Sequence, residues 1–166
     1  ELAPRLSGRA REAQDAPYSG LLFDETGTAM LPTYSVKRGG IRYRYYASRP
    51  TLKGERSKAT ISRIPAAPFE AFMDSVLERL GLLSGSGELP VLHGVEIQRD
   101  SIILRLHKLA AMALWRAAEP DDTKLRDREV IKRRRELLAD GEALTEDGEL
   151  LVLSLPVRAR FRGGRT

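Results

Sequence analysis

The feature that most constrains the fold of this chain is one strongly amphipathic segment with strand-like sequence on both sides of it. Prolines at positions 65 and 68 suit the first turn of a helix. Apolar residues then recur at spacings of three and four, the period of one helix face. They are Phe69, Phe72, Met73, Val76, Leu77, Leu80 and Leu83. The pattern predicts a helix over residues 65–83, with Phe72, Val76 and Leu80 buried as the stripe that anchors the preceding segment.

Three short strands are predicted before this helix. Residues 18–23 and 30–36 are apolar runs joined by turn-forming residues, which predicts a hairpin. Residues 37–40 form the next turn, and residues 41–46 form a third strand. Because side chains alternate along a strand, we expect one face to pack and the other to meet a partner. The packed face would carry Ile41, Tyr43 and Tyr45, and the partner face Arg42, Arg44 and Tyr46.

The sequence after the helix predicts a second unit. A serine and glycine break at 84–87 ends the helix, and a second hairpin follows over 95–106. Helices are expected at 109–118 and 124–139, and a strand at 150–161 joins this hairpin in one sheet. The predicted class is therefore α+β: a small basic β-ribbon packed on an amphipathic helix, followed by a small antiparallel sheet with helical insertions.

Positive charge is concentrated in one stretch of the chain. The net charge is only +5, yet residues 37–63 hold nine basic residues and a single acid, Glu55. Such a run, interleaved with aromatic residues, is typical of phosphate contacts, and a two-stranded ribbon fits the major groove of DNA. Alternatively, these charges protect an edge strand from aggregation. The predicted DNA-binding residues are Lys37, Arg38, Arg42, Arg44, Tyr46, Arg49, Lys53, Arg56 and Lys58.

Two further basic clusters are candidates for DNA contact. Residues 126–135 are rich in arginine, but Asp127 and Glu129 are interspersed, as in an ordinary solvated helix face. The chain end carries Arg158, Arg160, Arg162 and Arg165. Either cluster would become the DNA surface if the ribbon charges serve only to protect an edge.

Composition argues against several kinds of chemistry. Cysteine is absent, and His93 and His107 alone cannot form a metal cluster, so we expect no metal and no cofactor. No run approaches the roughly 20 apolar residues that span a bilayer, so we expect a soluble, cytoplasmic protein without a membrane partner. Residues 24–28 look like the phosphorylation motif of ion-pumping ATPases, but they lie where a turn is needed between two short strands. We expect no catalytic residue in this chain.

Several motifs, taken in order, resemble large serine recombinases of the resolvase and invertase type. The resemblance begins with residues 20–30, the turn at 37–40 and the aromatic strand at 43–46, and continues through the segment at 62–66. It ends with the strand at 155–162 and the glycine pair at 163–164. Zinc-binding relatives carry a cysteine pair in the first turn, where this chain has Asp24 and Thr26. The resemblance therefore implies a metal-free ribbon, held instead by packing of Tyr18, Tyr43 and Tyr45 on the helix.

The resemblance also implies an organisation and a function. Residues 1–17 would be a linker from an absent catalytic domain, 18–83 the ribbon and helix, and 88–166 a hairpin and helix module truncated at its C-terminus. The expected function is to recognise and hold a recombination site on double-stranded DNA, together with other recombinase subunits. The serine nucleophile would lie in the missing domain. Two alternatives stay open: a protein-interaction module for synapsis, and an RNA-binding module that stacks bases on tyrosines.

Overall fold

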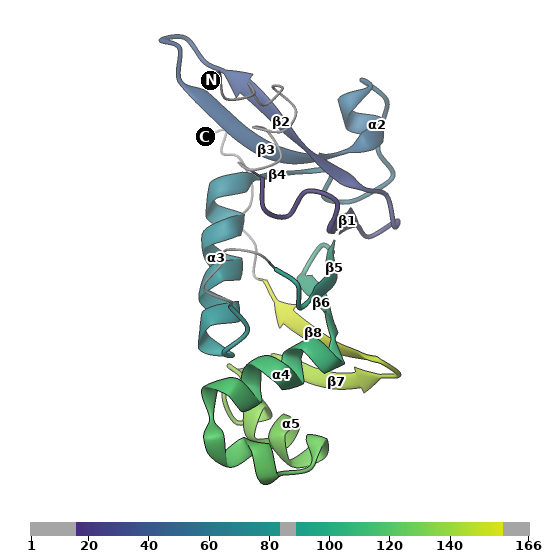
Figure 1. The fold of residues 1–166 in the computed structure, drawn as a ribbon. Coiled ribbons are helices and arrows are strands. Elements are labelled where there is room, and N and C mark those ends of the chain that lie inside the picture. Colours follow the sequence, from purple (N-terminus) through teal and green to yellow (C-terminus); the bar gives the residue numbers. More distant parts are fainter. Residues whose placement is uncertain (1–15, 84–88, 158–166) are drawn as a thin grey trace, which may run out of the picture.

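The computed structural model describes residues 16–83 and 89–157 and contains two sheets and several helices. A three-stranded antiparallel sheet has the order β2-β3-β4, and a five-stranded mixed sheet has the order β1-β5-β6-β8-β7. Figure 1 shows the smaller sheet at one end of an elongated molecule and the larger sheet beside the long helix α3 (Ala66–Arg79). The prediction of an α+β fold is confirmed. The predicted linker at 1–17, the break at 84–87 and the arginines beyond Val157 lie wholly or mostly outside the described residues.

The small sheet is a twisted hairpin with a short third strand. Strands β2 (Met30–Val36) and β3 (Arg42–Ser48) pair antiparallel, with Tyr34 opposite Arg44. The connecting turn requires glycine, since Gly39 and Gly40 have φ angles of 98° and 79°. Strand β4 (Arg63–Pro65) covers only the base of β3, pairing with residues 45–47. The hairpin tip therefore extends beyond the third strand (Figure 1).

The first predicted hairpin is wrong. Strand β1 (Leu22–Asp24) does not form a ladder with β2, and the two segments share only the isolated bridge between Phe23 and Ala29. Instead, β1 pairs in parallel with β5 (Leu92–Ile97), placing Leu22 beside Val95. Leu22 and Val95 are buried, so the apolar pattern of β1 is satisfied in the larger sheet. The turn at 24–28 thus carries the chain from one sheet to the other.

The larger sheet is otherwise antiparallel, as predicted. Strand β6 (Ser101–His107) pairs with β5 and with β8 (Leu150–Pro156), so the expected joining of the last strand to the hairpin is confirmed. Strand β8 runs to Pro156, and the part of the predicted strand from residue 158 to 161 lies outside the described residues. Strand β7 (Ala143–Asp147) was not predicted, and it forms a tight hairpin with β8. Most residues of β7 are exposed, so its sequence does not alternate between apolar and polar residues. For this reason the sequence did not predict a strand there.

Helix α3 buries one face, but not quite the predicted one. Val76 and Leu80 are buried as expected, whereas Phe72 is only partly covered and Phe69 is fully buried. Helix α4 (Lys108–Ala118) confirms the helix predicted at 109–118. The helix predicted at 124–139 is confirmed over the shorter range of α5 (Asp127–Arg135), and a 3₁₀ helix (Pro120–Lys124) precedes it. A short helix α2 (Arg49–Leu52) follows directly after β3.

One apolar core runs through both segments of the chain. Buried residues from the ribbon, α3, the larger sheet and α4 form a single contacting cluster, and the shared strand pair β1–β5 lies within it. Trp115 of α4 is buried, and its Nε1–H donates to the carbonyl oxygen of Leu80 at 2.6 Å. This bond ties the end of α3 to α4. Among the described residues, no helix has the length and apolar character needed to cross a membrane.

Candidate nucleic-acid interface

The predicted basic residues gather at the ribbon end of the molecule. The tip turn carries Lys37 and Arg38, strand β3 carries Arg42 and Arg44, and Arg49 begins α2. Lys53, Arg56 and Lys58 follow in the segment between α2 and β4. The exposed members of this set are Lys37, Arg38, Arg42, Arg49, Lys53, Arg56 and Lys58. Together with the exposed Arg63, they place a cationic surface on the part of the chain farthest from α4 and α5 (Figure 1).

The predicted assignment of faces on β3 is wrong for Tyr46. Its side chain has no exposed surface and packs edge-on against Phe69, with ring centroids 5.9 Å apart. Its hydroxyl donates to Oε1 of Glu70 at 2.7 Å. Burial raises the pKa of Tyr46 far above its ordinary value, and the bond to Glu70 raises it further, so the phenol stays protonated. Tyr46 is a core residue and does not reach a partner.

The reason is that β3 lies over α3 with Arg44 and Tyr46 turned toward the helix, where both contact Glu70. Tyr43 near the tip keeps 38% of its surface exposed, whereas residues 46–48 at the base of the strand are all buried. Ile41, expected to pack, is 57% exposed near the tip. Burial therefore increases along β3 from the exposed tip to the buried base instead of alternating between neighbouring residues. Of the tyrosines expected to replace the zinc site, Tyr18 does pack on Phe69.

Arg44 is held by an acid rather than presented freely. Its guanidinium forms an ion pair with Oε2 of Glu70, the same carboxylate that accepts from Tyr46. Both partners are only partly exposed, at 22% for Arg44 and 15% for Glu70. Glu70 thus neutralises one of the nine cations of the basic stretch and fixes its orientation over the start of α3.

Three other cations lie over tyrosine rings of the ribbon. The Arg42 guanidinium lies 3.6 Å from the centre of the Tyr34 ring, and Arg63 lies 3.8 Å from that of Tyr45. The Lys37 ammonium lies 4.7 Å from the Tyr43 ring centre. Cation–π contacts of this kind contribute about 0.5–1 kcal/mol at exposed sites. They hold long, flexible side chains in preferred places on the ribbon.

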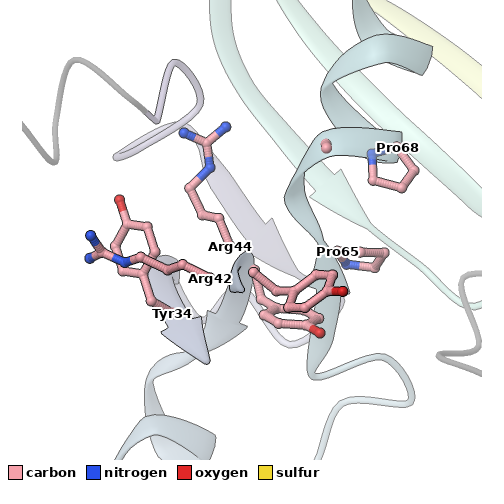
Figure 2. Close-up of a pocket in the computed structure, with 8 residues that line it drawn as sticks. Tyr34, Arg42, Arg44, Pro65 and Pro68 are labelled. Carbon is pink, nitrogen blue, oxygen red and sulfur yellow. The ribbon is translucent and has the colours of Figure 1, made fainter. Parts of the chain in front are cut away.

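A groove with a volume of about 590 Å³ lies where β3 extends past the end of β4. Figure 2 shows Arg42 and Arg44 on one side of it and Pro65 and Pro68 on the other. The remaining lining residues are Tyr34, Tyr43, Tyr45 and Ala67. No acid is among these eight lining residues, so the groove combines flat apolar walls with a cationic rim.

A hydrogen-bonded cluster occupies the turn at residues 24–28. Asp24 is buried, and its Oδ1 accepts from the N–H and hydroxyl of Thr26 at 2.9 and 2.6 Å and from Thr28 N–H at 3.1 Å. Its Oδ2 accepts from the Ser48 hydroxyl at 2.6 Å. Burial alone would raise the pKa of Asp24, but these bonds outweigh it and lower the pKa. The cluster fastens the turn to the end of β3.

The second basic cluster is largely engaged in structural contacts. Asp122, almost fully buried, accepts from Arg133 at 2.7 Å and from Arg134 at 3.0 Å. Arg135 donates to the carbonyl oxygen of Leu144 at 2.9 Å. Arg126, Arg128 and Lys132 are exposed on the outside of this region. Arginines 133–135 are therefore explained by packing of α5.

The two histidines lie together on the surface of the larger sheet. The rings of His93 and His107 are 5.0 Å apart and perpendicular, and both residues are exposed. Residues 16–83 and 89–157 contain no group of three or more His, Cys, Asp or Glu placed to hold a metal ion.

Sequence reasoning missed two residues that shape the interface. Tyr34 lies opposite Arg44 and under Arg42, which the register of the turn at 37–40 could have revealed. Glu70 was not singled out, because its contact with Arg44 depends on how the helix and the strand pack. Comparison of the chain with models of protein families, with curated proteins and with solved structures found no match.

Proposed function

We propose that this chain binds double-stranded DNA through its ribbon end, as a non-catalytic part of a serine site-specific recombinase. The observation that carries the proposal is the exposed cationic surface of the ribbon and the α2 segment. Eight of the nine basic residues between positions 37 and 63 are exposed, and the stretch contains a single acid, Glu55. Such a surface displaces condensed counterions when it meets DNA phosphates, which drives binding.

The shape of the ribbon supports contact with a groove of DNA. The β2–β3 hairpin projects beyond β4, so two antiparallel strands and a cationic turn are available at its end. A two-stranded β-ribbon fits within the major groove, which is about 12 Å wide. Lys37 and Arg38 at the tip would then approach the groove, while Arg49, Lys53 and Lys58 would lie along the flanking backbone.

The recombinase assignment is supported by the order of motifs described above. The chain would hold the recombination site while a serine in a separate catalytic domain forms the covalent link to DNA. Other recombinase subunits would be its protein partners, and the cytoplasm its place of action. Neither metal nor cofactor takes part in this function.

A protein-contact role is the second candidate, because apolar residues flank the cationic tip. Val36 and Ile41 keep 69% and 57% of their surfaces exposed on either side of the turn. Exposed apolar residues beside a polar rim favour a protein interface. A role in synapsis would use this tip for contact between subunits, with DNA held by another surface.

Binding of fluorescent duplex DNA at several salt concentrations tests the proposal. The apparent association constant should fall with salt with a log–log slope of about −0.9 for each phosphate contacted. A flat salt dependence, or no binding at low salt, would contradict it. Salt-insensitive self-association that disappears in Val36→Ser/Ile41→Ser would support the protein-contact role instead.

A further inference from the structure

We propose that the tip of the β2–β3 hairpin reads thymine in the major groove, with Val36 and Ile41 contacting the methyl group of the base. The inference rests on the proposed DNA-binding function and names the feature of the base pairs that the tip recognises. Three observations carry it: the exposure of these two aliphatic side chains, their placement on opposite faces of a narrow turn, and the positive charge between them.

Val36 and Ile41 are aliphatic residues that the fold leaves outside its core. They keep 69% and 57% of their surfaces exposed, more than any other large apolar residue described between positions 16 and 83. Neither belongs to the buried cluster or packs against it. Because removal of aliphatic surface from water favours association, a ligand that offers an apolar contact at the tip gains affinity there.

The turn between the two residues is narrow and well defined. The N–H of Lys37 donates to the carbonyl oxygen of Ile41 at 3.0 Å, and the N–H of Gly40 donates to that of Lys37 at 3.1 Å. Gly39 and Gly40 add no side chains at the end of the ribbon. Paired strands lie about 4.7–4.9 Å apart, whereas the major groove is about 12 Å wide. The tip, which extends beyond β4 (Figure 1), can therefore enter the groove end-on and approach the base edges.

The two aliphatic side chains point to opposite sides of this turn. Val36 is paired with Arg42, so their side chains share a face, whereas Ile41 directly precedes Arg42 and points to the other face. A flat protein surface laid on one face of the ribbon would cover only one of the two aliphatic residues. The walls and floor of a groove surround an inserted tip and can reach both. The placement therefore favours a DNA groove over a flat protein partner.

The chemistry of the tip favours both DNA and one base within it. Lys37 and Arg38 are exposed in the turn between Val36 and Ile41, and no acid occurs from residue 26 to residue 54. This positive charge matches the two phosphate backbones that border the major groove. Among the standard bases, thymine alone presents a methyl group in that groove, beside the donors and acceptors of the other bases. Aliphatic side chains cannot form hydrogen bonds with those polar groups, so they favour thymine.

Duplexes of alternating base pairs test the inference on the full chain without knowledge of a target site. An alternating A·T duplex is compared with one in which uracil replaces thymine, which removes the methyl group. A G·C duplex is compared with one that carries 5-methylcytosine, which adds a methyl group at the same position. Fluorescence anisotropy gives the affinity for each duplex.

Two variants show whether the tip is responsible. Val36→Ser/Ile41→Ser removes the aliphatic surface of the tip. Leu109→Ser is the matched control, because Leu109 on α4 is an aliphatic residue with 83% of its surface exposed. Melting temperatures show that each variant remains folded.

We expect the parent to bind the thymine duplex about 4-fold more tightly than the uracil duplex for each methyl group contacted, which corresponds to about 0.8 kcal/mol per buried carbon group. The duplex with 5-methylcytosine should likewise be bound more tightly than the one with cytosine. Val36→Ser/Ile41→Ser should lose both preferences and keep the salt dependence of binding, whereas Leu109→Ser should behave like the parent.

Equal, salt-dependent binding of the thymine and uracil duplexes by the parent would overturn this inference alone. A methyl preference that survives in Val36→Ser/Ile41→Ser would also overturn it, because another surface would then contact the methyl groups. Self-association that this variant abolishes, without any methyl preference in the parent, would overturn it in favour of a protein contact at the tip. Absence of binding to any duplex would overturn the proposed function as well.

Discussion

At the scale of single residues, two carboxylates organise the ribbon end. Asp24 accepts four hydrogen bonds, which hold the turn at residues 24–28 against the end of β3. Glu70 joins Arg44 of the ribbon to the buried phenol of Tyr46. The bond of Asp24 to Ser48 and the ion pair of Glu70 with Arg44 could not be predicted, because each depends on which strand end or helix face packs nearby. Asp24 was expected to act as a turn residue, and this expectation is confirmed by its bonds to Thr26 and Thr28.

Asp24→Asn should destabilise the fold by about 1–3 kcal/mol at neutral pH, because bonds to a buried carboxylate become weaker bonds to an amide. The effect should depend on pH. Since the folded state lowers the pKa of Asp24, its stabilisation is present above the unfolded pKa of about 3.9 and is lost as the pH falls through the folded pKa.

Denaturant unfolding from pH 7 down to pH 2 measures both effects. The stability of the parent should fall more steeply below about pH 4 than that of Asp24→Asn, and the exposed Asp140→Asn serves as the control. Parallel pH profiles for parent and Asp24→Asn would show that the carboxylate has another role.

The melting temperature of the parent should be the same with and without a chelator.

Glu70→Gln tests whether this acid restrains Arg44. The variant keeps an oxygen that can accept from Tyr46 but removes the charge that neutralises Arg44, so affinity for duplex DNA should rise. If Arg44 then meets a phosphate, the salt dependence should steepen by about 0.9 in log–log slope. Glu78→Gln, an exposed acid on the same helix, should change neither quantity. A Glu70→Gln variant that binds DNA like the parent would show that Arg44 does not contact it.

At the scale of elements, periodicity predicted which segments form but not always how they pair. The helix at 66–79, the hairpin of β5 and β6 and the position of β8 follow from strong apolar patterns that leave little choice of structure. Strand β1 has the same kind of pattern, yet its three residues contain no information on whether they pair with β2 or β5. The faces of β3 were misassigned because alternation does not show how far the strand extends past its neighbours: residues 42 and 43 are both exposed near the tip, and residues 46–48 are all buried at the base.

Phe69 rather than Phe72 should be the main anchor between α3 and the ribbon. Its ring lies between those of Tyr18 and Tyr46, with centroids 5.2 and 5.9 Å away. Truncation of Phe69 to alanine should cost about 3–5 kcal/mol in the free energy of unfolding. Phe72→Ala is the natural comparison and should cost clearly less, because the side chain is only partly buried. Equal shifts of the denaturant midpoint in the two variants would contradict this assignment of the core.

At the scale of the whole molecule, the two exposed basic regions lie at opposite ends. Figure 1 shows the ribbon and α2 at one end and α4 and α5 at the other, with the larger sheet between them. Many arginines near α5 are engaged by Asp122 or backbone carbonyls, whereas most cations of the ribbon end are exposed. Composition predicted both clusters, but only the packed structure distinguishes a cationic surface from arginines that hold a helix in place.

The central claim is that DNA binds at the ribbon end, and two charge-matched variants test it most directly. One replaces Arg38, Lys53, Arg56 and Lys58 with glutamine, and the other replaces Lys124, Arg126, Arg128 and Lys132. All eight residues are exposed, so melting temperatures should stay close to that of the parent. The measurement is the salt dependence of duplex binding for the parent and both variants. The ribbon variant should bind more weakly, with a slope reduced by about 0.9 for each phosphate that it no longer reaches, while the other variant behaves like the parent. A reduced slope in the second variant, with the ribbon variant unchanged, would contradict the account and move the DNA surface to α5.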